Sequence, residues 1–301
     1  MTDSQNVLVT GTSSGFGLLI AKTLAEAGHT VVATMRGMDT KNSDKAQALR
    51  DYAKERNLRV HVVELDVTDE ASVAAGITTA LSLCGHIDVL VNNAGVGGMG
   101  LNETFTTEQV QAIYNVNVFG VHRVVRALLP HLHTRGRGLL IHISSGLGRL
   151  VIPFLGVYGS TKFALEALAE SYRYELAPLG IESVIVQPGA FGTDFGVHSM
   201  MGTDAARGTA YGPLAQVPMQ MAAGMQAMLS APNAPNPQEV ADAVLKLIST
   251  PHGQRPARTV VDRINGQGPS AVNQVCEQIE QAMLTGMQMG GMLSVKTHTE
   301  R

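Results

Sequence analysis

Short apolar runs rich in β-branched residues alternate with longer segments of helical periodicity along most of the chain. The apolar runs lie at residues 7–10, 30–35, 60–64, 89–91, 139–144 and 183–186. Helical patterns lie at 16–27, 45–56, 70–83, 108–116, 121–132 and 157–177. Strands buried on both faces have continuous apolar runs, and connecting helices allow them to pair in parallel. The pattern predicts a single-domain α/β fold, a doubly wound parallel sheet with helices on both faces.

The segment from about residue 194 to 237 differs from the rest, since it is rich in Gly, Ala, Pro and Met. A long connection of this kind is typical of a functional loop, and we expect a substrate lid with some helix. A helix over 238–248, a strand near 259–261 and an amphipathic stretch over 270–284 follow. The predicted organisation is one domain over residues 1–268, with the lid at 194–237, and a C-terminal helical extension with a loose tail over 269–301.

Composition narrows the classes of function. The 301 residues include 22 basic and 25 acidic side chains, and this net charge of −3 favours neither nucleic acid nor an anionic membrane as a partner. Cys84 and Cys276 lack CxxC spacing, so we expect no disulfide framework and no metal site. No apolar run reaches 18 residues, and the first residues lack a basic leader. We therefore expect a cytoplasmic protein without a membrane span.

The first predicted strand leads into Thr10-Gly11-Thr12-Ser13-Ser14-Gly15-Phe16-Gly17, where a helical pattern begins. Glycines let such a turn tighten and approach a ligand, while free N–H groups at the helix start favour a pyrophosphate. The spacing differs from G-x-G-x-x-G, so only the mechanism of that motif applies. The turn is therefore either a dinucleotide site or merely a tight connection.

The end of the second predicted strand bears on the choice of dinucleotide. An NAD site places an acidic residue about 20 residues beyond the glycines, on the ribose 2′-hydroxyl. Met35 and Arg36 stand there instead, and Arg36 can bind a 2′-phosphate with help from the Ser13 hydroxyl. We expect NADP(H) to be preferred, and NAD(H) stays possible because Asp39 lies nearby. Arg36 as a solvated loop charge is the other interpretation.

Tyr158 and Lys162 stand four residues apart at the start of the long helix, so their side chains share one helix face. A tyrosine titrates near pH 10, but a neighbouring ammonium and an oxidised nicotinamide both stabilise its phenolate. The pair can therefore act as a general acid/base. Because Tyr and Lys often share a helix for packing and solubility alone, other motifs must support this interpretation.

Such motifs are present, and with them the sequence resembles the short-chain dehydrogenase/reductase family, in its Thr-Gly-x-x-x-Gly-x-Gly and Tyr-x-x-x-Lys branch. The resemblance implies a Rossmann-like fold and covers Val7 to about Val261. The motifs stand in the family's order: Thr10 to Gly17, Asp66 in Leu-Asp-Val, Asn92 to Gly95, Asn117 in Asn-Val-Phe-Gly, Ser145 in Ile-Ser-Ser, Tyr158 with Lys162, and Pro188 to Thr193.

The resemblance also implies roles for these residues. Tyr158 is the general acid in carbonyl reduction, Ser145 holds the carbonyl oxygen, Lys162 binds the nicotinamide ribose and tunes Tyr158, and Asn117 anchors a water. Together with the turn and Arg36, the residues expected to contact the cofactor are Gly11, Ser13, Ser14, Gly15, Phe16, Gly17, Arg36, Asp66, Val67, Asn93, Ala94, Gly95, Tyr158, Lys162, Pro188, Gly189, Phe191 and Thr193.

Several of these positions have a simpler structural interpretation. Asn92 and Asn93 can cap a strand end, and Pro188-Gly189 can simply turn the chain. Ser144 rather than Ser145 can face the site, because adjacent strand residues point to opposite faces. We expect His142 to be packed or hydrogen-bonded, since no G-x-S-x-G motif surrounds the serines.

We expect the substrate to be a hydrophobic ketone, aldehyde or alcohol. The residues expected to line its pocket are mostly apolar, namely Leu147, Pro153, Phe154, Phe191, Phe195, Met200 and Met201. Thr34 to Arg36 and the long C-terminal segment look similar to steroid- and retinoid-metabolising members. One alternative is a 3-ketoacyl-carrier reductase, with the carrier on Arg149, Arg173 or the Arg135/Arg137 pair. The other is a non-catalytic NADP(H)-binding regulatory protein.

The resemblance further suggests a homodimer or homotetramer built from the helices at 121–132 and 157–177. The apolar stripe of the first helix permits such an interface, but it can equally face the sheet. Its members are Val121, Val124, Val125, Leu128 and Leu129.

Overall fold

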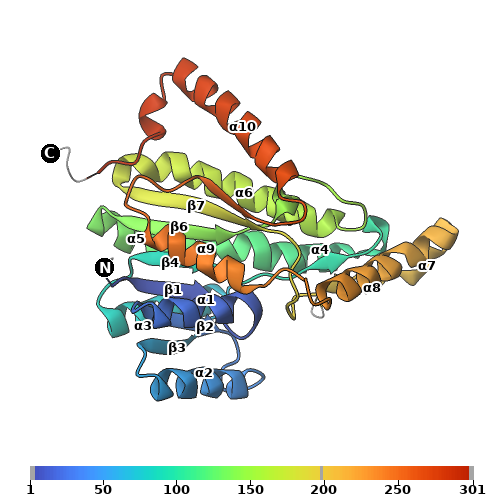
Figure 1. The fold of residues 1–301 in the computed structure, drawn as a ribbon, viewed down its shortest axis with the longest axis horizontal. Coiled ribbons are helices and arrows are strands. Elements are labelled where there is room, and N and C mark those ends of the chain that lie inside the picture. The colour runs from blue at the N-terminus through green and yellow to red at the C-terminus, as the bar shows by residue number, and fades with distance from the viewer. Residues whose placement is uncertain (1–3, 197–198, 298–301) are drawn as a thin grey trace.

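Seven parallel strands form the central sheet of the computed structural model, which describes residues 4–196 and 199–297. Their order is β3-β2-β1-β4-β6-β7-β9, so the chain starts in the middle and winds outward in both directions (Figure 1). The predicted fold class is confirmed. The strands are β1 (Asn6–Thr10), β2 (Thr30–Met35), β3 (Val60–Glu64), β4 (Val89–Asn92), β6 (Gly138–Ile143), β7 (Ile181–Pro188) and β9 (Arg258–Val261).

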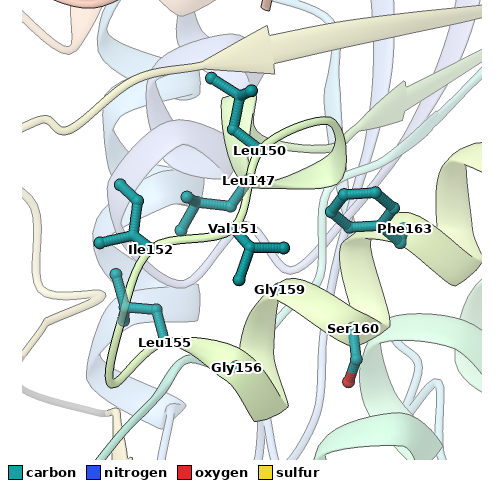
Figure 2. A pocket seen from close by; sticks show the side chains of 9 residues that line it. All are labelled: Leu147, Leu150, Val151, Ile152, Leu155, Gly156, Gly159, Ser160 and Phe163. Atoms are coloured by element: carbon teal, nitrogen blue, oxygen red, sulfur yellow. The ribbon is translucent and has the colours of Figure 1, made fainter.

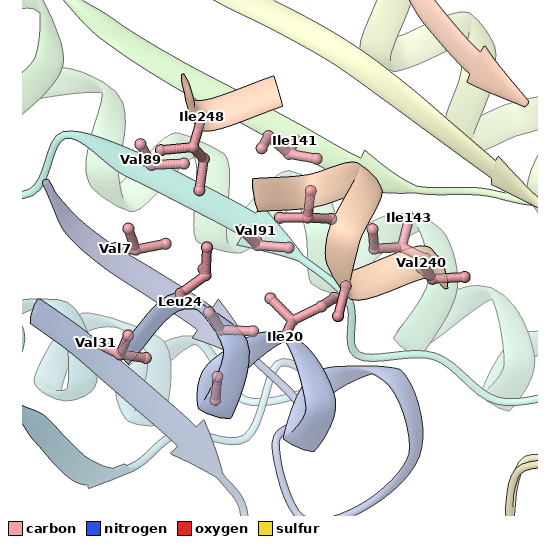
Figure 3. Packing of buried hydrophobic residues seen from close by; sticks show 14 of the residues in the cluster. Val7, Ile20, Leu24, Val31, Val89, Val91, Ile141, Ile143, Val240 and Ile248 are labelled. Atoms are coloured by element: carbon pink, nitrogen blue, oxygen red, sulfur yellow. The ribbon is translucent and has the colours of Figure 1, made fainter. Parts of the chain in front are cut away.

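Helices cover both faces of this sheet. One core cluster joins the sheet to α1, α2 and α9, and the other joins it to α3, α5 and α6. Figure 3 shows the first, in which Ile20 and Leu24 of α1 and Val240 of α9 pack over strand valines. The helices are α1 (Gly15–Glu26), α2 (Ser43–Glu55), α3 (Glu70–Cys84), α4 (Thr107–Tyr114), α5 (Val121–Arg135), α6 (Gly156–Leu176) and α9 (Gln238–Ser249).

The apolar stripe of α5 faces the sheet, which decides between the two interpretations of the sequence. Val121, Val124, Val125 and Leu128 are buried in the second core cluster, and Leu129 is partly buried beside it. These side chains stabilise the monomer, because their apolar surface is removed from water within one chain. They therefore give no support to an oligomer interface.

The predicted lid contains more regular structure than its composition indicates. It includes α7 (Ala205–Gly208), a 3₁₀ segment at Thr209–Gln216 and α8 (Val217–Leu229). Its first part is tied to the body by a two-stranded parallel sheet, in which β8 (Met200–Met201) pairs with β5 (Gly98–Met99). Residues 197 and 198 of the lid lie outside the described residues. Neither short strand has a pattern that predicts it.

A long C-terminal helix, α10 (Gln267–Gly286), begins beside α6 and runs diagonally away from it in Figure 1. It has contacts with β9, and the 3₁₀ turn that follows it at Gly290–Met292 has contacts with α6. No helix in the described part of the chain is long and apolar enough to cross a membrane. Over residues 4–196 and 199–297, no cluster of three or more His, Cys, Asp or Glu side chains is arranged to hold a metal. The end of the predicted loose tail, residues 298–301, lies outside the residues that the structure describes.

Candidate active site

The residues singled out from the sequence gather at the carboxyl-terminal edge of the sheet. Gly11 follows β1, Arg36 follows β2, Asp66 follows β3, Asn93 follows β4 and Ser145 follows β6. Parallel strands end at one edge, so these positions meet although they are far apart in sequence.

The glycine-rich turn after β1 is packed too tightly for side chains. Gly11 has a φ of +73°, and a Cβ there would lie 2.8 Å from the Ala94 Cα. A Cβ on Gly17 would overlap the Gly11 carbonyl. The Asn93 side chain donates hydrogen bonds to the carbonyls of Thr10 at 2.8 Å and Gly11 at 3.0 Å. Asn93 was expected to contact the cofactor, and its amide holds this turn closed.

The first turn of α1 presents backbone N–H groups at the same edge. Ser14 is the N-cap residue, and its side chain makes no capping bond with any described residue. Phe16 packs edge-on against Phe191 with ring centroids 5.5 Å apart, and a Cβ on Gly15 would lie 3.7 Å from the Thr193 Cβ. Two predicted cofactor segments, 15–17 and 191–193, therefore lie together beside a helix N-terminus, which favours an anion.

Arg36 lies at the neighbouring strand end with its side chain 49% exposed, 3.9 Å from the Asp66 carboxylate. Burial would raise the pKa of Asp66, but hydrogen bonds from Thr68 and the charge of Arg36 lower it overall. The Glu64 carboxylate accepts hydrogen bonds from the N–H groups of Gly37 and Met38, both at 2.7 Å. The loop after Arg36 is thus fixed by a residue that no sequence pattern indicated.

Val67, another predicted cofactor residue, is buried in the second core cluster. A Cβ on Gly120 would lie 2.9 Å from its Cγ2, and its carbonyl accepts a hydrogen bond from Arg123. At the end of β7, Gly189 lies against the Asp262 side chain, where a Cβ would overlap the carboxylate. Both positions are therefore tightly packed at the sheet edge.

Tyr158, Lys162 and Ser145 meet at the start of α6. The Lys162 Nζ lies 5.7 Å from the centre of the Tyr158 ring and donates to the Ile143 carbonyl at 2.9 Å. The Ser145 hydroxyl accepts the Leu147 N–H at 3.1 Å, and its interaction with the Tyr158 side chain lowers the pKa of the phenol. Ser144 points elsewhere, to the Glu166 carboxylate at 2.9 Å. Of the two serines, Ser145 is therefore the one that contacts Tyr158.

Burial has the largest effect on the pKa values of Tyr158 and Lys162. It raises the pKa of Tyr158, and the Ser145 hydrogen bond only partly offsets the effect. Burial lowers the pKa of Lys162 to about 8, although the nearby Glu166 charge acts in the opposite direction. In the protein alone, Tyr158 is thus protonated and suited to donate a proton. The lowering of the tyrosine pKa by Lys162 together with an oxidised nicotinamide stays a prediction for the cofactor-bound protein.

His142 is a structural residue, as expected. Its ring lies 3.3 Å from the Asn92 amide nitrogen and 3.2 Å from the Ser183 hydroxyl, and it is fully buried. Burial and the Lys162 charge lower its pKa to about 3. The ring is therefore neutral and gives no support to a hydrolase.

Asn117 lies in a π-helical turn at Asn115–Gly120, and both polar atoms of its side chain are hydrogen-bonded within the protein. Its Oδ1 accepts the Val96 N–H at 2.9 Å. Its Nδ2 donates to the Val96 carbonyl at 2.9 Å and to the Thr161 hydroxyl at 3.0 Å. The amide thereby ties α6 to the loop after β4, and π-helical turns often mark functional sites.

The lid reaches this group through Phe195, whose ring lies 5.6 Å from the Tyr158 ring in an edge-to-face arrangement. The other predicted pocket residues are dispersed. Phe191 is turned toward Phe16, and Met200 packs beside Phe105. Only Phe195 of that set therefore has a described ring contact with Tyr158.

A separate apolar pocket of about 290 Å³ lies against the outer face of α6 (Figure 2). Gly156, Ser160 and Phe163 share that face, whereas Tyr158 and Lys162 lie on another. The pocket is lined by Leu147, Leu150, Val151, Ile152, Leu155, Gly156, Gly159, Ser160 and Phe163.

With this geometry in view, comparison with known proteins decides the family. A family model described as short chain dehydrogenase matches residues 5–201. The chain belongs to the short-chain dehydrogenase family. The resemblance inferred from the motifs is confirmed, and the match contains the turn after β1, Ser145, Tyr158 and Lys162.

Curated relatives of this short-chain dehydrogenase include the 3-ketodihydrosphingosine reductase of Bacteroides thetaiotaomicron, 39% identical over 191 residues, or 64% of this chain and 65% of the relative. Human retinol dehydrogenase 8 is 37% identical over 194 residues, or 64% of this chain and 60% of the relative. Less than two thirds of each relative is thus spanned. A solved short-chain dehydrogenase from Streptomyces avermitilis has a TM-score of 0.74 at 28% identity, covering 96% of this chain and 99% of that one.

The short-chain dehydrogenase also has buried and partly buried polar residues near the site that no sequence motif indicates. Glu166 follows Lys162 by one helical turn, and this i, i+4 spacing is the signal that could have indicated it. Arg258 of β9 and Asn273 of α10 join the same network, but no local pattern indicates them. Arg149, considered as a carrier contact, is ion-paired with Glu166 at 3.2 Å instead.

Proposed function

We propose that the protein is an NADP(H)-dependent oxidoreductase that interconverts a carbonyl and an alcohol on a hydrophobic substrate. The observation that carries the proposal is the buried pair of Tyr158 and Lys162, in which Lys162 Nζ lies 5.7 Å from the centre of the Tyr158 ring, beside the partly buried Ser145. Acid/base side chains at the edge of a dinucleotide-binding sheet suit carbonyl chemistry.

The residues present fit a dinucleotide. The turn at Gly11 to Gly17 excludes side chains, and the N-terminus of α1 directs N–H groups to the place where a pyrophosphate would bind. When bound, NADP(H) would supply or accept the hydride. Arg36 favours the 2′-phosphate, because its guanidinium is half exposed and can reach a ligand. The ion pair that it forms with Asp66, at 3.9 Å, is long. NAD(H) is the weaker alternative.

The chain's own residues provide the proton and hold the substrate. Tyr158 carries its proton, so it can donate to the oxygen of a carbonyl during reduction. The Ser145 hydroxyl is placed to hold the same oxygen. Lys162, fixed by the Ile143 carbonyl, places a positive charge close to the developing phenolate. Together they stabilise charge that appears only in the transition state.

We assign the substrate to bulky apolar ketones, aldehydes or alcohols. The Phe195 ring covers Tyr158, and the lid that carries it is rich in methionine, a residue that adapts to irregular ligands. Relatives named for 3-ketodihydrosphingosine and for retinol support a lipid-like substrate. An acyl carrier is less favoured, because Arg149 and Arg135 are paired with Glu166 and Asp88. A cytoplasmic location and a homodimer or homotetramer are part of the proposal.

The test follows NADPH oxidation by the purified protein over aliphatic, aromatic, steroidal and long-chain ketones and aldehydes, with NADH alongside. Tyr158→Phe should lose at least about a hundredfold in kcat, since general acid catalysis contributes roughly 10²–10⁴-fold. Tyr172→Phe removes a hydroxyl from the same helix, where it contacts His122, and should leave turnover unchanged. Ser145→Ala should cost far more activity than Ser144→Ala. NADPH binding without turnover of any carbonyl would instead favour the non-catalytic NADP(H)-binding protein.

A further inference from the structure

Behind the proposed active site, one buried carboxylate has polar partners from β7, from β9 and from the loop between β6 and α6. The Glu166 side chain is only 2% exposed, one turn beyond Lys162 on α6. Its Oε1 accepts hydrogen bonds from the Ser144 hydroxyl at 2.9 Å and from the Gln187 amide at 2.7 Å. Its Oε2 lies 3.2 Å from Arg149 Nε and 3.0 Å from Arg258 Nε. So many charge-assisted contacts fix the carboxylate firmly.

The C-terminal helix completes this network. Asn273 of α10 accepts a hydrogen bond from Arg149 Nε at 3.1 Å and donates one to Gln187 Oε1 at 2.6 Å. Further along α10, Glu280 is hydrogen-bonded to the Tyr174 hydroxyl of α6 at 3.2 Å. Arg149 is therefore held from two sides, by α6 and by α10, a helix that lies beyond the residues matched by the family model.

Both ends of the segment around Ser145 are anchored in this way. Ser144 precedes Ser145 and bonds to Glu166, while Arg149 follows the short 3₁₀ turn at Gly146–Gly148 and contacts the same carboxylate. Gly148 lies so close that a Cβ there would be 2.6 Å from Glu166 Oε1. A shift of the carboxylate would therefore be transmitted to the backbone on each side of Ser145.

We propose that Glu166, assisted by Asn273 of α10, is a positioning residue that sets the place of the Ser145 hydroxyl relative to Tyr158. This inference rests on the proposed function, because it assigns these residues to the alignment of that chemistry. It also gives the C-terminal helix a part in catalysis. Misplacing a reacting group by about 1 Å costs roughly a hundredfold in rate, so buried supports of this kind affect turnover strongly.

Glu166 has a second, electrostatic effect that a purely structural residue lacks. Its charge raises the pKa of Lys162 against the lowering by burial. Among the described residues, the titratable groups that interact with Lys162 are Tyr158 and Glu166 of α6 and His142 of β6. His142 is neutral, so removing the Glu166 charge leaves burial unopposed. The pH at which activity falls with Lys162 deprotonation should then decrease.

The test compares Glu166→Gln, Asn273→Ala and the control Glu277→Gln, which removes a carboxylate from the exposed side of α10. We measure kcat, KM, the Kd of NADPH and the pH profile with a carbonyl that the wild type reduces. Glu166→Gln should lower kcat about tenfold to a hundredfold, keep the NADPH Kd within about twofold, and shift the alkaline limb to lower pH. Asn273→Ala should lower kcat less and leave that limb in place, and Glu277→Gln should match the wild type.

A wild-type kcat and pH profile in folded Glu166→Gln would overturn the inference while the proposed function stands. If Glu166→Gln does not fold, Asn273→Ala decides, and a wild-type kcat in that variant overturns the inference. Absence of turnover by the wild-type protein on every carbonyl would overturn the proposed function and this inference together.

Discussion

The substitution Gly11→Ala, in the turn after β1, tests directly whether this turn binds the cofactor. A Cβ at this position would lie 2.8 Å from the Ala94 Cα, while ordinary contact begins at 3.4 Å, which is 0.6 Å farther. The Ala94 Cα is a backbone atom, and the position of a Cβ is fixed by its own backbone, so no side-chain rotation relieves the clash. The φ of +73° adds a second cost, because a left-handed conformation is unfavourable for alanine by about 1–2 kcal/mol. Overpacking adds about 1–3 kcal/mol.

Gly28→Ala is the matched control. Gly28 has a φ of +90°, and a Cβ there would meet no described heavy atom within 4 Å. Its substitution therefore introduces the backbone strain without the clash, at the end of α1 remote from the turn. We expect Gly28→Ala to lower the free energy of unfolding by about 1–2 kcal/mol and to leave the Kd of NADPH unchanged.

Two measurements separate the effect of the left-handed backbone conformation from the effect of the steric clash with Ala94. Urea unfolding without cofactor gives the free energy of unfolding, and fluorescence titration gives the Kd of NADPH. If the turn opens to relieve the clash, its N–H groups move away from the pyrophosphate. The extra cost of about 1–3 kcal/mol then appears as a Kd raised by about 5-fold to 100-fold. A Gly11→Ala protein that is folded and binds NADPH as the wild type does would refute the reasoning.

Three further outcomes follow from the site. Met35→Asp combined with Arg36→Ala should lower the NADPH:NADH ratio of kcat/KM by at least about tenfold, since a charge-assisted hydrogen bond is worth about 1.5–3 kcal/mol; an unchanged ratio would exclude Arg36 as the 2′-phosphate contact. Because burial lowers the pKa of Lys162 to about 8, its charge is present below that pH, and carbonyl reduction should decline as the pH rises through about 8. A profile flat through that range would contradict a role for the charge. Phe195→Ala removes the ring over Tyr158 and should raise KM for an apolar ketone about 2-fold to 10-fold at constant NADPH Kd, whereas an unchanged KM would place the substrate elsewhere.

The structure also changes the part assigned to the C-terminal segment. The sequence predicts a C-terminal helical extension with a loose tail over residues 269–301. In the structure α10 contributes Asn273 and Glu280 to the buried network of α6 and β9. Arg258 of β9 makes two hydrogen bonds to the Glu170 carboxylate in that network, at 3.0 and 2.9 Å. Deleting α10 would therefore expose polar groups that are paired with one another within the protein.

Features that depend on neighbours along the chain could be predicted from the sequence. Alternating apolar runs and helical patterns identified the parallel α/β fold, because strand and helix periods differ. The turn at Gly11 to Gly17 follows directly from the strand before it, and Tyr158 and Lys162 share a helix face through their four-residue spacing. Local geometry is sufficient for each of these inferences.

Contacts between distant segments could not be predicted from the sequence, because they form only when the chain folds. The partners of Glu166 come from residues 144, 149, 187 and 258, and no pattern within one element brings these positions together. From sequence, the apolar stripe of α5 fits packing against the sheet and packing against a partner chain equally well. The structure shows that it packs against the sheet. The pKa of Tyr158 likewise depends on burial, which arises only when the chain folds and segments such as the lid, through Phe195, pack against its ring.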